Sequence, residues 1–165
     1  MKVGIFGSAF NPPTLGHADA IVQFKGQFDE IWLVPSYAHA FGKQMLDFDK
    51  RCLMVDAFNE EVAKTGVVTK GAYLEKDMSR PGKPIYSYDL LTKLSEMHPE
   101  HQFSLIIGDD NAGGFDAFYK ADQIMAKWSV VVAKEREPIR STLIRERIKN
   151  DIDVSDLMFD SVIDV

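Results

Sequence analysis

The sequence predicts a doubly wound, Rossmann-like α/β fold, a mostly parallel sheet formed by a single domain over residues 1–165. Three observations indicate this fold. Short apolar runs alternate with helical patterns from one end of the chain to the other, which is typical of repeated βα units. The runs are continuously apolar, as in parallel strands that are buried on both faces. The length of 165 residues and the hydrophobic content of 45% fit one globular domain.

The expected strands are short runs rich in Val, Ile, Leu and Phe, at 2–7, 30–35, 67–72, 103–108 and 128–133. Helical patterns lie between and after them, at 15–27, 49–64, 87–97, 111–126 and 142–150. Asp49 and Ser141 have the side chains of N-caps for the second and the last of these helices. In a Rossmann-like strand order, the ligand crevice forms where the first and fourth strands end, which is at Gly7-Ser8 and Gly108-Asp109.

Composition excludes several classes of protein. A net charge of −6 argues against binding to duplex nucleic acid, and the lone Cys52 cannot form a disulfide within the chain. No apolar run approaches the roughly 18 residues of a membrane helix, and the first residues lead directly into a strand. We therefore expect a cytoplasmic protein with no nucleic-acid or membrane partner. The sequence indicates no particular oligomeric state.

The first expected strand runs into the segment GSAFNPPTLGHADAI, with Thr14 and His17 at the start of a helix. A spacing of three residues puts both side chains on one helical face, and Gly16 lets a flat base or a phosphate approach the backbone. Two interpretations are open. His17 donates a hydrogen bond to a phosphate at the helix N-terminus, or Thr14 caps a helix whose histidine is merely buried.

A second segment, IRSTLIRERI at 139–148, lies in a stretch (134–149) with six basic and three acidic residues within the acidic chain. Ser141 and Thr142 begin a helix whose N-terminus suits phosphate, and Arg145 offers a two-pronged donor for phosphate oxygens. The alternative is an ordinary capped helix with solvated arginines.

Together, GxxFNPPTxGH and STLIR resemble the two signature elements of the (H/T)xGH nucleotidyltransferase superfamily. Three further segments, VPSYAHAFGK (34–43), IYSYDLLTKL (85–94) and LIIGDDNAGGFDAFYKADQI (105–124), resemble the nicotinate/nicotinamide mononucleotide adenylyltransferase family within it. The chain departs from that pattern at several positions. Thr14 replaces the more usual histidine, Ala40-Phe41-Gly42 replaces Pro-Pro-His before Lys43, and Phe118 replaces tryptophan.

The resemblance implies transfer of the adenylyl group of ATP to nicotinate mononucleotide, or also to nicotinamide mononucleotide, with release of pyrophosphate in NAD biosynthesis. It implies that the partners are ATP and a pyridine mononucleotide. It also implies that Mg²⁺ is the cofactor, that it arrives bound to ATP, and that the protein has no metal site of its own. The implied catalytic residues are His17, Thr14, Lys43 and Arg145. The implied ATP-binding residues are Gly7, Ser8, Phe10, Gly16, His17, Gly108, Asp110, Ser141, Thr142 and Arg145, and the implied mononucleotide-binding residues are Lys43, Tyr86, Ser87 and Phe118.

Two alternatives stay open. Thr14 and the length of the chain also fit a phosphopantetheine adenylyltransferase, and the unusual FGK loop fits a non-catalytic nucleotide-binding module of the same fold. Outside these motifs, His98 and His101 have the spacing of metal ligands, but Pro99 and the polar residues around it favour a surface turn.

Overall fold

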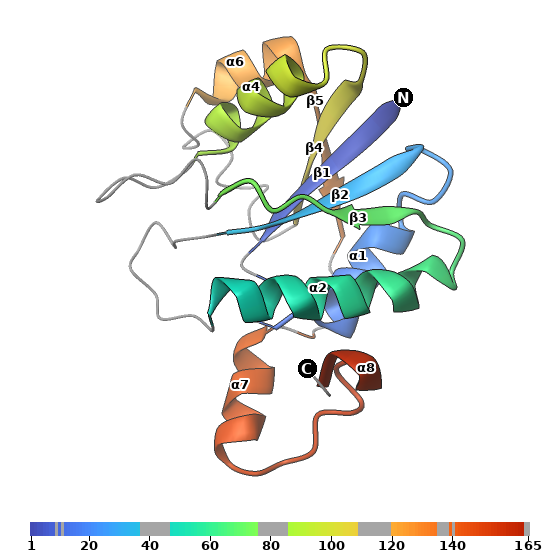
Figure 1. Cartoon of the computed structure of the whole chain (residues 1–165), viewed down its shortest axis with the longest axis vertical. Coiled ribbons are helices and arrows are strands. Elements are labelled where there is room, and N and C mark those ends of the chain that lie inside the picture. Colours follow the sequence, from blue (N-terminus) through green and yellow to red (C-terminus); the bar gives the residue numbers. More distant parts are fainter. Residues whose placement is uncertain are drawn as a thin grey trace.

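The computed structural model describes residues 1–8, 10, 12–36, 47–75, 86–108, 120–134, 139 and 141–163. Its centre is a parallel sheet of five strands in the order β3-β2-β1-β4-β5 (Figure 1). The strands are β1 (Lys2–Ser8), β2 (Glu30–Pro35), β3 (Thr69–Gly71), β4 (Gln102–Gly108) and β5 (Ser129–Ala133). The predicted fold class and the five predicted strands are confirmed, with β3 shorter than its apolar run.

The helices are α1 (Leu15–Val22), α2 (Phe48–Ala63), α4 (Ser87–Met97), α6 (Ala121–Lys127), α7 (Ser141–Lys149) and α8 (Asp160–Ile163). Helix α1 ends earlier than predicted, since turns follow it and Gly26 adopts a φ of 86°. The predicted cap Asp49 is wrong, because Asp47 is the N-cap of α2 and Asp49 lies in its first turn. Helix α8 was not predicted, since its four residues are too few to show a helical period. No helix in the described ranges combines the length and the apolar character needed to cross a bilayer.

Helices cover both faces of the sheet, as Figure 1 shows. On one face, α1, α2, α7 and α8 bury a cluster that includes Phe6, Leu33 and Ile106 of the strands. On the other face, α4 and α6 pack on Val3, Ile5 and other strand residues whose side chains point to that face. Because successive side chains of a strand point to opposite faces, both clusters draw on the same strands, which explains their continuous apolar sequences.

The strand order reverses between β1 and β4. The chain leaves β1 toward β2 and β3 on one side, then crosses to β4 and β5 on the other. Phe6 pairs with Ile106 in register, so the ends of β1 and β4, at Ser8 and Gly108, lie side by side. Ligands of open α/β sheets bind at such a switch point, and the predicted switch is confirmed.

Candidate active site

Thr14 and His17 form a reciprocal cap at the start of α1. The Thr14 hydroxyl accepts a hydrogen bond from the backbone N–H of His17 at 3.1 Å. In return, Nδ1 of His17 accepts one from the backbone N–H of Thr14 at 2.9 Å. Sequence reasoning left a helix cap and a functional histidine as alternatives; the structure shows the cap, and the cap itself orients the imidazole.

The same contacts define the hydrogen-bonding state of the His17 ring. Since Nδ1 accepts a backbone N–H, the proton of the neutral ring resides on Nε2. Nε2 lies 3.3 Å from Oγ of Ser8, the last residue of β1. The rings of Phe10 and Phe6 pack against the imidazole, with ring centroids 4.9 and 6.1 Å away. His17 therefore presents a fixed N–H donor at the carboxyl end of β1.

Burial lowers the pKa of His17 from 6.5 to about 4. The ring is therefore neutral at physiological pH, and it acts as a hydrogen-bond donor without a full positive charge. Between about pH 4 and 6.5, the unfolded chain binds a proton at this position and the folded chain does not. Stability is therefore lost as the pH falls through this interval, and His17 contributes no such loss above it.

We predict that His17 titrates near pH 4, well below an ordinary histidine. The measurement is a pH titration of the histidine Cε1–H signals by NMR, in which the His17→Ala variant assigns the signal by its loss. A His17 signal with a midpoint near 6.5 would contradict the burial of the ring.

A hydrogen bond joins the two signature elements. The Ser141 hydroxyl, at the first residue of α7, donates to the carbonyl of Pro12 at 2.8 Å. The predicted cap role of Ser141 is thus replaced by a link to the segment before α1. Gly16 serves the same junction, because a Cβ at this position would come within 2.3 Å of the Ile139 carbonyl. Close packing of the chain before α7 therefore requires this glycine.

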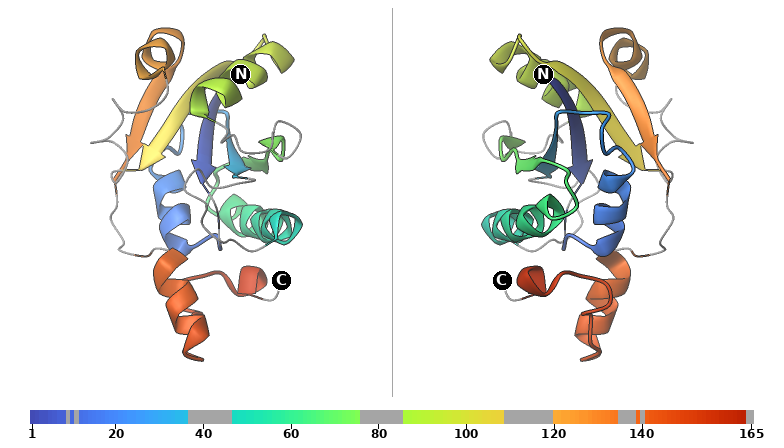
Figure 2. Two further views of the ribbon diagram at one scale, coloured as in Figure 1. Left: turned by 90° about the vertical axis from the view of Figure 1, so that its left-hand side faces the viewer. Right: turned by 90° about the vertical axis from the view of Figure 1, so that its right-hand side faces the viewer.

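Helix α7 presents Thr142 and Arg145 on its exposed surface, and Arg145 Nη2 donates to Oγ1 of Thr142 at 3.2 Å. Figure 2 shows α7 next to α1, with the chain returning from α7 to α8 beside α2. On this return the Leu157 carbonyl accepts the N–H of Leu15, the first residue of α1, at 2.8 Å. The backbone amides of Leu15 and His17 are thus both engaged in hydrogen bonds within the protein.

Two residues that were predicted to contact the nucleotide are buried. Phe10 was expected to line the nucleotide cleft, but its exposure is 0% and it belongs to the core cluster of the α1–α2 face. The backbone of Phe10 has a φ of 46°, and its buried ring packs against the imidazole ring of His17. Thr14 was expected to hold phosphate; it is 1% exposed and its hydroxyl contacts His17, and its role toward phosphate stays a prediction.

The remaining predicted residues lie at the carboxyl edge of the sheet or outside the described ranges. Gly7 is the second-last residue of β1 and Gly108 the last of β4, and a Cβ at Gly7 would meet only the Val34 carbonyl, at 3.9 Å. Tyr86 is the N-cap of α4 and Ser87 its first residue, so both lie at the N-terminal end of this helix. Their direct contact with a ligand stays a prediction. Lys43, Asp110 and Phe118 lie outside the described residues.

Sequence reasoning missed Arg51, a buried cation of α2. Its exposure is 1%, and its Nη1 donates to the carbonyl of Ser36, directly after β2, at 2.5 Å. Burial lowers the pKa of Arg51, while the charges of Glu75 and Asp47 oppose this change. Glu75 is itself buried and follows β3. The signal was present in the sequence, because Arg51 occupies an apolar position of a helical stripe with Phe48, Val55, Phe58 and Val62.

Comparisons with known proteins place the chain in a family. The model of the cytidylyltransferase-like family matches residues 5–147. A probable nicotinate-nucleotide adenylyltransferase of Myxococcus xanthus is 38% identical over 112 residues, which are 67% of this chain and 56% of that protein. One from Bacteroides thetaiotaomicron is 31% identical over 80% of this chain and 64% of its own length. The matched part is thus less than two thirds of either protein.

A protein of the same description from Anaeromyxobacter sp. is 29% identical over 98% of this chain and 91% of its own. Among solved structures, a Vibrio parahaemolyticus protein described as a candidate nicotinate-nucleotide adenylyltransferase is 34% identical. It superposes with a TM-score of 0.84 over 99% of this chain and 90% of its own. The nicotinic acid mononucleotide adenylyltransferase of Plasmodium falciparum, solved with NaAD, has a TM-score of 0.73 at 17% identity, which shows the fold alone. The chain belongs to the cytidylyltransferase-like family, and within it resembles the nicotinate-nucleotide adenylyltransferases.

Proposed function

We propose that this protein transfers the adenylyl group of MgATP to nicotinate mononucleotide, forming the dinucleotide and pyrophosphate. The observation that carries the proposal is the Nε2–H of His17, fixed by the Thr14 cap at the carboxyl end of β1, next to the strand switch point. The names of the similar proteins support the acceptor. We propose that the reaction takes place in the cytoplasm.

In this mechanism a 5′-phosphate oxygen of the mononucleotide attacks the α-phosphorus of ATP. The bond from the α-phosphorus to the oxygen that joins it to the β-phosphorus breaks, and pyrophosphate leaves. The attacking oxygen is already ionised, so the reaction needs no general base and no protein nucleophile. Catalysis then consists of holding the two nucleotides in line and stabilising the charge that develops on the α-phosphate.

His17 is the residue proposed to stabilise that charge, through a hydrogen bond from Nε2 to a non-bridging oxygen of the α-phosphate. Its lowered pKa suits this role, because a neutral ring stays a donor and does not protonate the attacking phosphate. Ser8 lies beside Nε2 and would share the same phosphate. Lys43 is proposed to hold phosphates, Asp110 to contact the ribose, and Tyr86, Ser87 and Phe118 to hold the pyridine ring.

The test of the proposal is pyrophosphate release from MgATP with three acceptors: nicotinate mononucleotide, nicotinamide mononucleotide and phosphopantetheine. We expect turnover with nicotinate mononucleotide and slower turnover with the nicotinamide form. The hydroxyls of Tyr86 and Ser87 can serve either an acid or an amide, so the ratio of kcat/KM should be about 10- to 200-fold. Turnover with phosphopantetheine alone, or with none of the acceptors, would overturn the proposal.

We predict that Arg145→Ala mainly weakens the binding of ATP. Arg145 projects from the N-terminal half of α7, where it is proposed to bind the β- and γ-phosphates, which AMP lacks. Calorimetry with ATP and with AMP measures the two affinities, and Lys149→Ala at the end of the same helix is the matched control. Equal losses for ATP and AMP would place Arg145 away from the terminal phosphates.

A further inference from the structure

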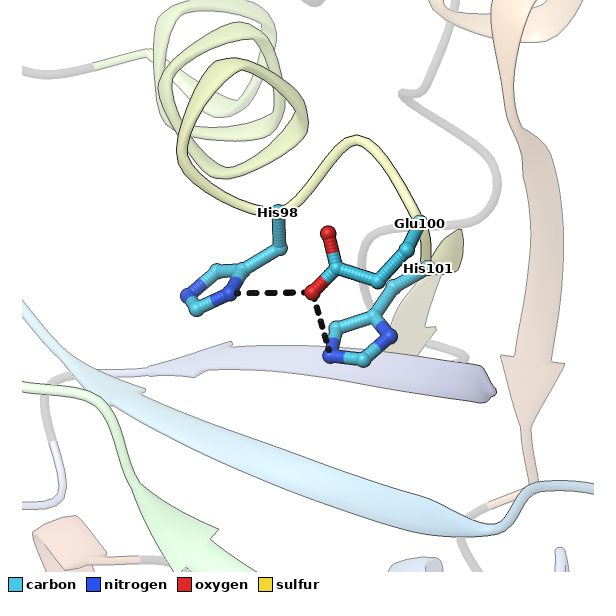
Figure 3. Close-up of side chains that lie close together, drawn as sticks. All are labelled: His98, Glu100 and His101. Carbon is cyan, nitrogen blue, oxygen red and sulfur yellow. Dashed lines mark ion pairs between the residues drawn. The ribbon is translucent and has the colours of Figure 1, made fainter.

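A cluster of two histidines and one glutamate lies at the other end of the sheet. His98 is the C-cap of α4, and Glu100 and His101 lie in the turn that leads into β4. One oxygen of Glu100, Oε1, lies 3.7 Å from Nδ1 of His98 and 3.5 Å from Nε2 of His101, as Figure 3 shows. The carboxylate oxygen is thus positioned between two imidazole nitrogens.

These separations are close to those of ligands around one metal ion. Four ligands arranged tetrahedrally at about 2.1 Å from zinc are about 3.4 Å from one another. In the cluster, Oε1 of Glu100 lies 3.5 and 3.7 Å from the two imidazole nitrogens, and one ligand atom from each of the three residues lies within 4.8 Å of the others. Glu100 is 61% exposed, so small side-chain rotations bring the atoms to bonding distance without a change in the backbone.

The two imidazoles are already held together by the backbone and by their ring contacts. The N–H of His101 donates to the carbonyl of His98 at 3.1 Å, which closes the turn. The two rings stack with centroids 5.4 Å apart, and each packs edge-on against Trp32, at 5.2 and 5.9 Å. Binding an ion therefore costs little ordering of these side chains.

The ligand set selects the kind of ion. Nδ1 of His101 lies toward the terminal amine of Met1, at 3.5 Å, so Nε2 is the ring nitrogen available to an ion. Two imidazole nitrogens and one carboxylate oxygen are a donor set typical of zinc and related transition metals, whereas Mg²⁺ prefers oxygen ligands alone. With three protein ligands, the fourth position is left for water.

We propose that His98, Glu100 and His101 form a binding site for one divalent transition-metal ion of the zinc type. The site is separate from the proposed nucleotide site, because it precedes β4 and the nucleotide site follows it. The seven residues of β4 span roughly 20 Å. A bound ion stabilises the folded chain by joining the end of α4 to the turn that enters the sheet.

The test is calorimetric titration of the untagged, metal-free protein with Zn²⁺, without nucleotide, together with thermal unfolding. We expect one Zn²⁺ per chain and a rise in Tm, neither of which Mg²⁺ produces. His98→Ala and Glu100→Gln should each weaken Zn²⁺ binding at least 10- to 100-fold, since outer-sphere partners of metals already have effects of that size. Glu96→Gln, which removes an exposed carboxylate from the same helix, is the matched control and should bind as the unchanged protein does.

Three results would overturn the proposal. One is the lack of saturable Zn²⁺ binding, and another is an equal affinity in His98→Ala, Glu100→Gln and the control. The third is loss of binding in His17→Ala with retention in His98→Ala, which would place the ion among the nucleotide-site residues. Since no nucleotide is present in these titrations, they do not depend on the proposed adenylyl transfer.

Discussion

Replacement of His17 by alanine should reduce kcat about 100- to 1000-fold, the effect typical of losing one hydrogen-bond donor to a transition state. The reason is geometric, because Thr14 holds the ring by Nδ1 and leaves the Nε2–H as a fixed donor at the end of β1. The KM for ATP should change far less, since this hydrogen bond strengthens only as charge develops on the α-phosphate. Steady-state kinetics with MgATP and nicotinate mononucleotide measure both quantities.

Two controls separate chemistry from folding in that experiment. Lys93→Ala removes an exposed side chain from α4 and should leave kcat unchanged. Thermal unfolding of His17→Ala shows how much stability is lost with the cap and with the contacts to Phe10. Wild-type turnover in a folded His17→Ala protein would exclude His17 from the reaction, whereas a rise in KM alone would make it a ground-state binding residue.

Replacement of Arg51 by methionine should lower the free energy of unfolding by about 3–5 kcal/mol, the cost typical of breaking a buried charge interaction from one side. Methionine fills much of the same volume but leaves the Ser36 carbonyl without its donor and the buried Glu75 without the nearby cation. Total stabilities are about 5–15 kcal/mol, so this loss is a large part of what holds the chain folded. Urea unfolding measures it.

Lys50→Met is the matched control, because Lys50 is the exposed neighbour of Arg51 on α2 and its charge removal should change stability by less than about 0.5 kcal/mol. The double variant Arg51→Met/Glu75→Gln should be more stable than Arg51→Met, since it also removes the buried negative charge that the Arg51 cation attracts. If Arg51→Met and Lys50→Met unfold at the same urea concentration, the hydrogen bond from Arg51 to the Ser36 carbonyl does not stabilise the fold.

Some features of the candidate site were visible in the sequence because they depend on neighbouring residues. The spacing of Thr14 and His17 makes them meet on the first turn of a helix, wherever that helix lies. The continuous apolar runs required strands covered on both faces, and this requirement led to the parallel sheet and to its switch point. In the same way, the turn at residues 98–101 followed from Pro99 and its polar neighbours.

Burial and contacts between distant segments were decided only by the tertiary structure. The requirement for Gly16 comes from the carbonyl of Ile139, and the partner of Ser141 is Pro12, more than a hundred residues away. Likewise, the sequence placed Phe10 after the end of a strand, and the folded chain buries its ring against His17, with a backbone φ of 46°. From the sequence alone came the local periodicities, and hence the elements and their order. Which side chains end in solvent, in the core or against one another depends on how those elements pack, and that packing is a property of the whole chain.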